Sequence, residues 1–441
     1  MEDSYLIKGG NKIQGSVRLS GAKNVALKAI IAALLFDSKV ILENVPKIND
    51  VQELIHLINR LGAKAEFKDK NTLEIDSSGL KSNKVDLLHA SKIRVSFMFF
   101  APLLQKFGKC LIPNPGGCRI GARPIDRIID GMNKLGAKII YNHETGYYEA
   151  SLKSKPEGRY KFNKSTHTGT ELLILFSVFS ASEVVLENVA LEPEIDELIN
   201  FLNEAGANIK RNKSRIIIKG VSSLKQKKPF RIISDSNEAV TFAILALASK
   251  GEVIVERAPL NLMEIFINKI EKTGSNVKQS QDKLIFRYNS KIKPVDIETA
   301  AFPGFKTDWQ PNWAVLMTQA EGEESIIHER VFENRFNYVD ELMKLGAHIV
   351  FIKPRVKNPK AFYDFNYKED EIYQQAIRIQ GGFPLHGGVL NISDLRAGAS
   401  LAIASLIAEG ESIISGASIL ERGYEDFVEK VKSLGGDIKK I

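Results

Sequence analysis

The sequence of 441 residues is poor in cysteine and has no long apolar run. Two cysteines, Cys110 and Cys118, are too few for a disulfide framework, and alone they do not make a zinc site. Apolar stretches such as LLILF (172–176) are far too short to span a bilayer. The opening MEDSYLIKGG has no apolar leader segment. These absences predict a cytoplasmic protein that is not inserted into a membrane.

The charge balance is mildly basic, with 61 Lys and Arg against 53 Asp and Glu, a net charge of +8. Such a balance suits nucleic acids or small anionic substrates. Most lysines are dispersed, and the basic turns contain glycine and acids rather than interleaved aromatic rings. A basic nucleic-acid-binding protein, with affinity that falls steeply as salt rises, is therefore the weaker, non-enzymatic alternative.

One structural unit is repeated along the whole chain. A β-branched run, a polar loop, a helical apolar pattern, a glycine and a second strand recur at intervals of about 70 residues. The glycines that suit left-handed helix ends are Gly62, Gly136, Gly206, Gly274, Gly346 and Gly435. Between them lie helices that are apolar nearly all round, so we expect these helices to be buried. The pattern predicts an α+β fold of six βαβαββ-type repeats, with sheets outside and helices inside.

Six repeats predict two domains of three repeats each, with a crossover near 230–234. We expect one domain over 22–233, and a second formed by 1–21 together with 234–441, with a cleft between them. A six-unit solenoid is the alternative. The last interval is longer than the others, and its excess lies in the charged and aromatic segment 353–375, for which the sequence indicates no function.

Positively charged residues stand in the polar turns of several repeats. Helix N-termini in such turns favour anions, and arginine and lysine bind phosphate and carboxylate. Taken singly, each cation is more typical of a surface or ion-paired residue, but six at equivalent turns indicate an anionic, phosphorylated substrate. The six are Lys23, Arg94, Arg123, Arg335, Arg396 and Arg422.

Asp308 occupies the corresponding turn of the fifth repeat, in GFKTDWQPNW. It could act as a general base or accept a sugar hydroxyl. From its position alone, the favoured role is an N-cap for the helix beginning near Trp309. Asp235 and Asp394 occupy equivalent turns and carry the same ambiguity.

Cys118 lies between Gly117 and Arg119, whereas Cys110 lies in an apolar run typical of a structural cysteine. The glycine-flanked setting predicts exposure. A neighbouring arginine lowers a thiol pKa from its usual value of roughly 8.5, which favours nucleophilic or redox chemistry. A bound phosphate dianion would instead keep the thiol protonated as an acid. An incidental thiol is an equal alternative on these residues alone.

Together these motifs resemble the enolpyruvyl transferases over nearly the whole chain. The matching segments, in the family's order, are SGAKN (20–24), GGCRIGARPID (116–126), EPEI (192–195), TDWQ (307–310), VFENRF (331–336), SDLRA (393–397) and RGYE (422–425). The branch that acts on shikimate-3-phosphate shares the fold but lacks the cysteine loop, so GGCRIGARPID points to the branch that acts on UDP-N-acetylglucosamine. The resemblance implies a two-domain inside-out α/β barrel that closes over its substrates.

The reaction implied by the resemblance moves the enolpyruvyl group of phosphoenolpyruvate to the 3′-hydroxyl of UDP-N-acetylglucosamine, with release of phosphate. In the family this reaction is the first committed step of peptidoglycan precursor synthesis. It needs no metal or cofactor, and in cysteine-bearing members the antibiotic fosfomycin alkylates the thiol. The implied partners are these two small molecules, with no nucleic acid and no insertion into a membrane.

The resemblance also assigns roles to residues. Cys118 would protonate C3 of phosphoenolpyruvate, and Asp308 would take the sugar hydroxyl proton. Phosphate would be bound by Lys23, Arg123 and Arg422, and the carboxylate would lie near Arg335 and Arg396. The UDP-sugar would be held by Asn24, Arg94, Arg123, Pro124, Ile125, Asp126, Arg127, Lys164, Ser165, Thr166, His167 and Val331.

Some positions depart from the family pattern. KSTHTGTE (164–171) places His167 in the uridine region, and Ser236 stands where an arginine is common. Arg127 and Lys306 replace apolar or proline positions, and the segment 353–375 is additional. A paralogue that acts on another nucleotide-sugar, or on shikimate-3-phosphate, is therefore the alternative enzyme.

Overall fold

The computed structural model describes residues 3–117, 120–121 and 123–441, and it divides into two compact units. The first unit contains the chain through Ser20 and Ser234–Ile441. The second contains Gly21–Ile233, except the segment around Ile120 and Gly121, which groups with the first. None of the described helices is long and apolar enough to cross a membrane.

The first unit contains three four-stranded sheets among its described residues, in the orders β21-β22-β1-β23, β15-β16-β14-β2 and β17-β18-β20-β19. Its strands are β1 (Ser4–Lys8), β2 (Gln14–Arg18), β14 (Glu252–Glu256), β15 (Asn276–Ser280), β16 (Lys283–Arg287), β17 (Ile297–Glu298), β18 (Ser325–His328), β19 (His348–Ile352), β20 (Ala376–Gln380), β21 (Val389–Asn391), β22 (Glu411–Ser415) and β23 (Asp437–Lys440). Its helices are α8 (Ser236–Ala248), η3 (Leu260–Leu262), α9 (Glu264–Lys272), η4 (Thr307–Trp309), α10 (Gln310–Thr318), α11 (Val339–Lys344), α12 (Pro359–Phe362), α13 (Leu395–Ile407), α14 (Ala417–Leu420) and α15 (Phe427–Ser433).

The second unit repeats this plan, with described sheets in the orders β11-β12-β10-β9, β13-β3-β5-β4 and β6-β8-β7. Its strands are β3 (Val40–Glu43), β4 (Lys64–Phe67), β5 (Leu73–Asp76), β6 (Lys109–Pro113), β7 (Ala137–Asn142), β8 (Tyr147–Leu152), β9 (Gly158–Lys161), β10 (Glu183–Glu187), β11 (Asn208–Asn212), β12 (Arg215–Lys219) and β13 (Phe230–Arg231). Its helices are α1 (Lys23–Ala32), η1 (Ala33–Leu35), α2 (Asn49–Arg60), α3 (Leu87–Ala90), η2 (Arg94–Phe99), α4 (Phe100–Phe107), α5 (Asp126–Lys134), α6 (His167–Ser177) and α7 (Pro193–Glu204).

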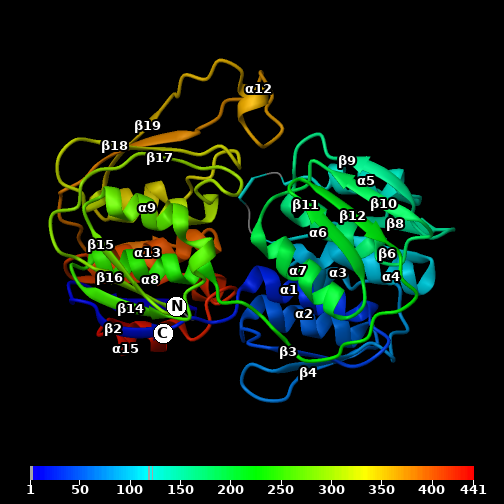
Figure 1. Ribbon diagram of the computed structural model, residues 1–441. Coiled ribbons are helices and arrows are strands. Elements are labelled where there is room, and N and C mark those ends of the chain that lie inside the picture. The colour runs from blue at the N-terminus through cyan, green and yellow to red at the C-terminus, as the bar shows by residue number, and fades with distance from the viewer. Residues whose placement is uncertain (1–2, 118–119, 122) are drawn as a thin grey trace. The chain divides into compact units, whose positions relative to one another are not determined.

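Apolar helices form the centre of each unit, as the sequence predicts. All residues of α8 and α10 are buried, and these helices pack against each other and against α13. Helices α8 and α13 lie inside the first unit (Figure 1). In the second unit α4 packs on α6, while α1 packs on α7. A helix with no polar face is stable only where other elements surround it. The predicted fold class, with sheets outside and helices inside, is therefore confirmed.

The repeated glycines end the outer helices in the expected backbone conformation. All six predicted glycines have a positive φ, from +82° at Gly274 to +107° at Gly206. Residues with a Cβ rarely adopt this conformation, so glycine lets the chain turn from each helix into the next strand.

Strands far apart in sequence complete several of the sheets. β1 pairs with β22 in antiparallel register, with Leu6 opposite Ile413, and it also pairs with β23. β2 joins β14, and β13 joins β3, in parallel. Each unit is thus closed by pairing between distant segments.

Candidate active site

Asp308 lies between two buried arginines in the first unit. It sits in η4, the turn that leads into the buried helix α10. Its Oδ1 lies 2.8 Å from Arg335 Nη2, and its Oδ2 lies 3.2 Å from Arg396 Nε. The two arginines are only 4% exposed, whereas Asp308 is partly accessible. A carboxylate and two guanidinium groups therefore converge at the end of α10.

The preference for an N-cap at Asp308 is wrong. No side-chain hydrogen bond from Asp308 caps η4 or α10, because both carboxylate oxygens are engaged by the arginines. Asp235 and Asp394 do act as caps, accepting from the backbone N–H groups of Asn237 and Arg396. Equivalent sequence positions thus serve different roles, and the carboxylate of Asp308 forms ion pairs with both arginines.

The arginines control the ionisation of Asp308. Burial alone would raise the pKa of its carboxyl, but the positive charges of Arg335 and Arg396 outweigh burial and hold the pKa below its ordinary value. The pKa of Arg396 is raised instead: burial lowers it, and interactions with Tyr424 and Asp308 more than compensate. All three groups are therefore charged at neutral pH.

Both arginines retain hydrogen-bonding capacity. Arg335 Nη1 donates to Thr307 Oγ1 at 2.8 Å, and the Arg396 guanidinium lies 5.6 Å from the centre of the Tyr424 ring. Arg335 Nε and Arg396 Nη1 are buried with no hydrogen-bond partner among the described residues. Buried donors are normally satisfied, so these two N–H groups are available to an acceptor such as an anion.

Glu329 was not predicted from the sequence, although it supports the Arg335 side of this cluster. It is fully buried and accepts hydrogen bonds from Thr307 Oγ1 at 2.8 Å and from the Val331 N–H at 2.7 Å. Burial raises the pKa of Glu329 and outweighs the lowering effect of Arg335. Glu329 thereby links predicted residues Val331 and Arg335 to the turn that carries Asp308. In the sequence, Glu329 could have been found as a charged residue that directly follows a β-branched strand.

The second unit carries the other predicted cations. Lys23 begins α1, and its Nζ forms an ion pair with Asp50 Oδ2 at 2.6 Å. Arg94 begins η2 and donates to the backbone carbonyl of Arg123. Burial, followed by repulsion from Arg123, lowers the pKa of Arg94 to about 10, which leaves it positively charged at neutral pH. The structure brings Arg94 and Arg123 together and pairs Lys23 with a carboxylate.

The remaining predicted residues of this unit stand at the starts of two helices. Asp126 and Arg127 open α5, directly after Pro124 and the buried Ile125. Lys164 and Ser165 precede α6, which Thr166 caps by accepting from the Gly169 N–H at 3.4 Å. Asn24 is half-buried in the first turn of α1. Arg422 is also partly buried, in the first unit between α14 and α15.

The six cationic positions are not all equivalent, which corrects the expectation from the repeats. Lys23, Arg94 and Arg396 begin or enter buried helical segments. Arg123, Arg335 and Arg422 instead precede the outer helices α5, α11 and α15. The two kinds of loop look alike in the sequence of the repeats, because each contains a cation near the start of a helix.

Cys118 lies outside the described residues, as do Arg119 and Ala122. The other cysteine, Cys110, is 2% exposed in β6, and burial raises the pKa of its thiol. Cys110 is thus a structural residue, as predicted.

His167 is held by a buried carboxylate that the sequence analysis missed. Its Nε2 lies 3.2 Å from Glu171 Oε1, and Lys28 Nζ lies 3.1 Å from Glu171 Oε2. Glu171 in α6 and Lys28 in α1 are almost fully buried. In the sequence they could have been found as charged residues in otherwise apolar helices. Burial lowers the His167 pKa, but attraction to Glu171 outweighs burial and leaves the pKa raised.

This raised pKa predicts a pH-dependent contribution to stability. The protonated imidazole is favoured in the folded state, so its contribution is complete below the ordinary pKa of 6.5 and is lost as pH rises through the folded value. We expect the difference in unfolding temperature between the wild type and His167→Gln to be largest below pH 6.5. Thermal unfolding followed by circular dichroism from pH 5.5 to 8.5 measures this difference, and a gap that widens with rising pH would contradict the assignment.

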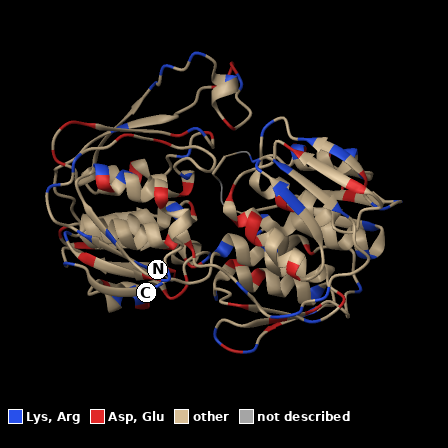
Figure 2. Cartoon of the chain, in the orientation of Figure 1, with Lys and Arg blue, Asp and Glu red and all other residues tan. Residues whose placement is uncertain are grey.

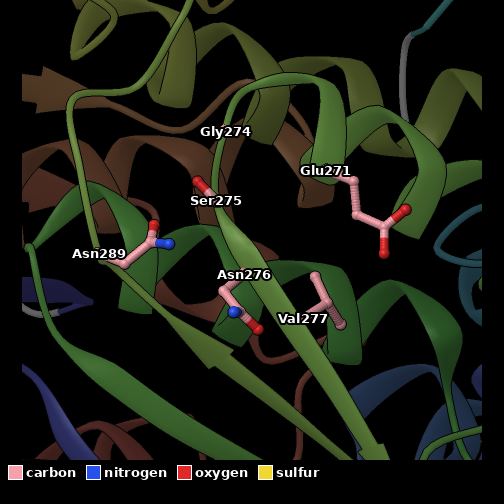
Figure 3. Close-up of a pocket in the computed structure, with 6 residues that line it drawn as sticks. All are labelled: Glu271, Gly274, Ser275, Asn276, Val277 and Asn289. Carbon is pink, nitrogen blue, oxygen red and sulfur yellow. The ribbon is translucent and has the colours of Figure 1, made fainter.

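No metal centre accompanies these residues: among the described part of the chain, no group of three or more His, Cys, Asp or Glu could hold a metal ion. A cavity of about 380 Å³ in the first unit is lined by Glu271, Gly274, Ser275, Asn276, Val277 and Asn289 (Figure 3). It contains none of the predicted site residues.

The family model for EPSP synthase (3-phosphoshikimate 1-carboxyvinyltransferase) matches residues 7–431. The chain belongs to the enolpyruvyl transferase family. This enolpyruvyl transferase is 36% identical to UDP-N-acetylglucosamine 1-carboxyvinyltransferase of Koribacter versatilis, over 100% of this chain and 96% of the relative. It is 37% identical to the protein of the same name from Halothermothrix orenii, over 99% of both chains.

Solved structures show the same fold at lower identity. The enolpyruvyl transferase NikO from Streptomyces tendae superposes with a TM-score of 0.87 and 22% identity, over 100% of this enolpyruvyl transferase and 99% of NikO. EPSP synthase from Acinetobacter baumannii gives a TM-score of 0.73 at 15% identity, over 99% of both chains. These likenesses agree with the six-sheet architecture described above.

Proposed function

We propose that this enolpyruvyl transferase moves the enolpyruvyl group of phosphoenolpyruvate to the 3′-hydroxyl of UDP-N-acetylglucosamine. The reaction releases phosphate and supplies peptidoglycan precursor synthesis in the cytoplasm. The names of the relatives, at 36–38% identity over nearly the full chain, support this acceptor. The structural observation that carries the proposal is the arginine pair around Asp308, with two buried N–H donors available to an anion.

The proposed mechanism uses Asp308 as the acceptor of the sugar hydroxyl proton. In the structure the positive charges of the two arginines balance the negative charge of this carboxylate. When Arg335 and Arg396 donate to the carboxylate of phosphoenolpyruvate, their hold on Asp308 weakens and its pKa rises toward a value suited to a base. Substrate binding would thus activate the base as it forms the reactive complex.

The covalent steps proceed by addition and elimination. Cys118 gives a proton to C3 of phosphoenolpyruvate while the sugar oxygen bonds to C2 and Asp308 receives the hydroxyl proton. The resulting tetrahedral ketal then loses a proton from C3 and its phosphate from C2, which restores the double bond. Lys23, Arg123 and Arg422 would stabilise the phosphate as its negative charge develops.

A phosphate-release assay tests this function. We expect phosphate only when both phosphoenolpyruvate and UDP-N-acetylglucosamine are present, together with a product heavier than the sugar nucleotide by one enolpyruvyl group. Mass spectrometry of the reaction mixture identifies that product. Phosphate release with shikimate-3-phosphate in place of the sugar nucleotide would overturn the proposal.

A different uridine nucleotide is the second candidate acceptor, and His167 is the observation that favours it. The imidazole stands at the start of α6, directly after Thr166, and attraction to Glu171 raises its pKa, which favours a contact with an anionic group of the acceptor. The same assay, run with other uridine nucleotides, would identify this acceptor by a higher kcat/KM than that for UDP-N-acetylglucosamine.

A nucleic acid is not favoured by the distribution of charge. Figure 2 shows basic and acidic residues interspersed along the elements of each unit in this view. Several basic residues are also paired with acids, including Lys23 with Asp50 and Lys28 with Glu171.

A further inference from the structure

The fifth repeat contains a long excursion where other repeats have short hairpins. β11 and β12 are joined by residues 213–214, and β15 and β16 by residues 281–282. The corresponding strands β19 and β20 are separated by residues 353–375, which include the short helix α12 (Figure 1). Residues 353–375 are called the excursion below.

The excursion is folded around its own aromatic cluster. The ring of Tyr363 lies 5.1 Å from that of Phe365 and 5.6 Å from that of Tyr367, and Tyr373 lies 5.0 Å from Tyr367. Tyr363 is 4% exposed and Phe365 is 8% exposed. Such packing gives the excursion a defined shape, which a hydrated polar loop would lack.

The excursion contacts the loop that carries Val331 and Arg335, residues 329–337, which we call the Arg335 loop. The guanidinium of Arg330 lies 4.1 Å from the centre of the Phe362 ring. Arg330 also donates to the Phe362 carbonyl oxygen from Nε at 3.2 Å and from Nη2 at 3.0 Å. The Asp364 N–H donates a hydrogen bond to the Arg330 carbonyl oxygen at 2.9 Å. Phe362 therefore holds Arg330 through both its ring and its backbone.

The end of the excursion binds the same loop at a second place. Gln375 is buried, and its Nε2 donates to the carbonyl oxygens of Glu329 at 2.8 Å and of Phe332 at 3.1 Å. Its Oε1 accepts from the Asn334 N–H at 2.7 Å, while Asn334 Oδ1 accepts from the Gln374 N–H at 2.7 Å. The short hairpins contribute less: one backbone bond joins Val189 to Ser214, for example, at 3.0 Å.

We propose that the excursion is a brace that positions the Arg335 loop for the acceptor substrate, with Phe362 and Arg330 as its principal positioning residues. The inference rests on the proposed function, in which Val331 and Arg335 contact substrate. Neither Phe362 nor Arg330 needs to touch the substrate. They fix the backbone from which Val331 projects, and the buried Glu329 connects that backbone to Thr307 beside Asp308.

Phe362→Ala tests the brace, with Ile372→Ala as the control, because Ile372 belongs to the excursion but is 94% exposed. We expect Phe362→Ala to raise KM for UDP-N-acetylglucosamine about tenfold with a smaller change in kcat, because an arginine–aromatic contact of this kind is lost. Ile372→Ala should leave KM within about twofold. Phe362→Tyr keeps the ring and should restore the wild-type KM.

Amide hydrogen exchange provides a readout that does not depend on activity. Peptides containing Val331 and Asn334 should exchange faster in Phe362→Ala than in the wild type, and at the wild-type rate in Ile372→Ala. Unchanged exchange in Phe362→Ala, or equal effects in both variants, would overturn the brace. Faster exchange with an unchanged KM would overturn its role in substrate positioning. If the wild type does not use UDP-N-acetylglucosamine, the proposed function fails while exchange still decides whether the brace exists.

Discussion

Asp308→Asn is expected to lower kcat by about 10²–10⁴-fold, the usual contribution of a general base. The amide cannot accept the sugar hydroxyl proton. In the wild type each carboxylate oxygen of Asp308 pairs with an arginine, whereas in the variant the NH₂ group would lie against one of these guanidinium groups. Steady-state phosphate release at saturating concentrations of both substrates measures the loss. The size of the change reflects removal of the only group that the proposed mechanism assigns to this proton.

The control for Asp308→Asn is Asp86→Asn. Asp86 caps α3 in the second unit by accepting from the His89 N–H at 3.0 Å, and asparagine caps helices about as well as aspartate. Asp86→Asn should therefore retain kcat. An Asp308→Asn protein that is folded and turns over at a rate within about threefold of the wild type would remove Asp308 from the proton transfer.

Cys118→Ser is expected to abolish inactivation by fosfomycin and to lower kcat at least about a hundredfold. The thiolate is the nucleophile that the drug alkylates, and a serine hydroxyl is a far weaker acid and nucleophile than a thiol. Cys118→Asp should retain part of the activity, because a carboxylic acid can also donate a proton to C3. Time-dependent loss of activity, with the mass of the intact protein, measures both effects.

Cys110→Ala provides the comparison for the thiol experiment. Cys110 is buried and its pKa is raised, so we expect this variant to react with fosfomycin as the wild type does. If Cys118→Ser and the wild type were inactivated at equal rates, the thiol would have no part in the reaction with the drug.

The sequence was sufficient to predict the architecture because the repeated signals are local. Glycines at the ends of outer helices and helices without a polar face occur in each repeat, and the structure places both as expected. The resemblance to the enolpyruvyl transferases was likewise carried by short motifs. These features depend on residues a few positions apart, which periodicity captures.

The electrostatic contacts of the site were less accessible, because the partners are distant in sequence. Nothing near Asp308 indicates that Arg396 will approach its carboxylate, and local capping rules favoured the wrong role. Glu171 and Lys28 lie on different helices and become partners only when α1 and α6 belong to one core. The excursion was recognised as extra length, whereas its contacts with Arg330 required coordinates.

The placement of β1 has a consequence for synthesis on the ribosome. Residues 21–233 emerge as nearly one continuous stretch and can assemble their own three sheets while translation continues. β1 emerges earlier, yet its partners β22 (Glu411–Ser415) and β23 (Asp437–Lys440) are translated only after residues 21–233. The half of the protein that contains Asp308 therefore completes its final sheet after the other half has had time to fold, with its first strand waiting unpaired.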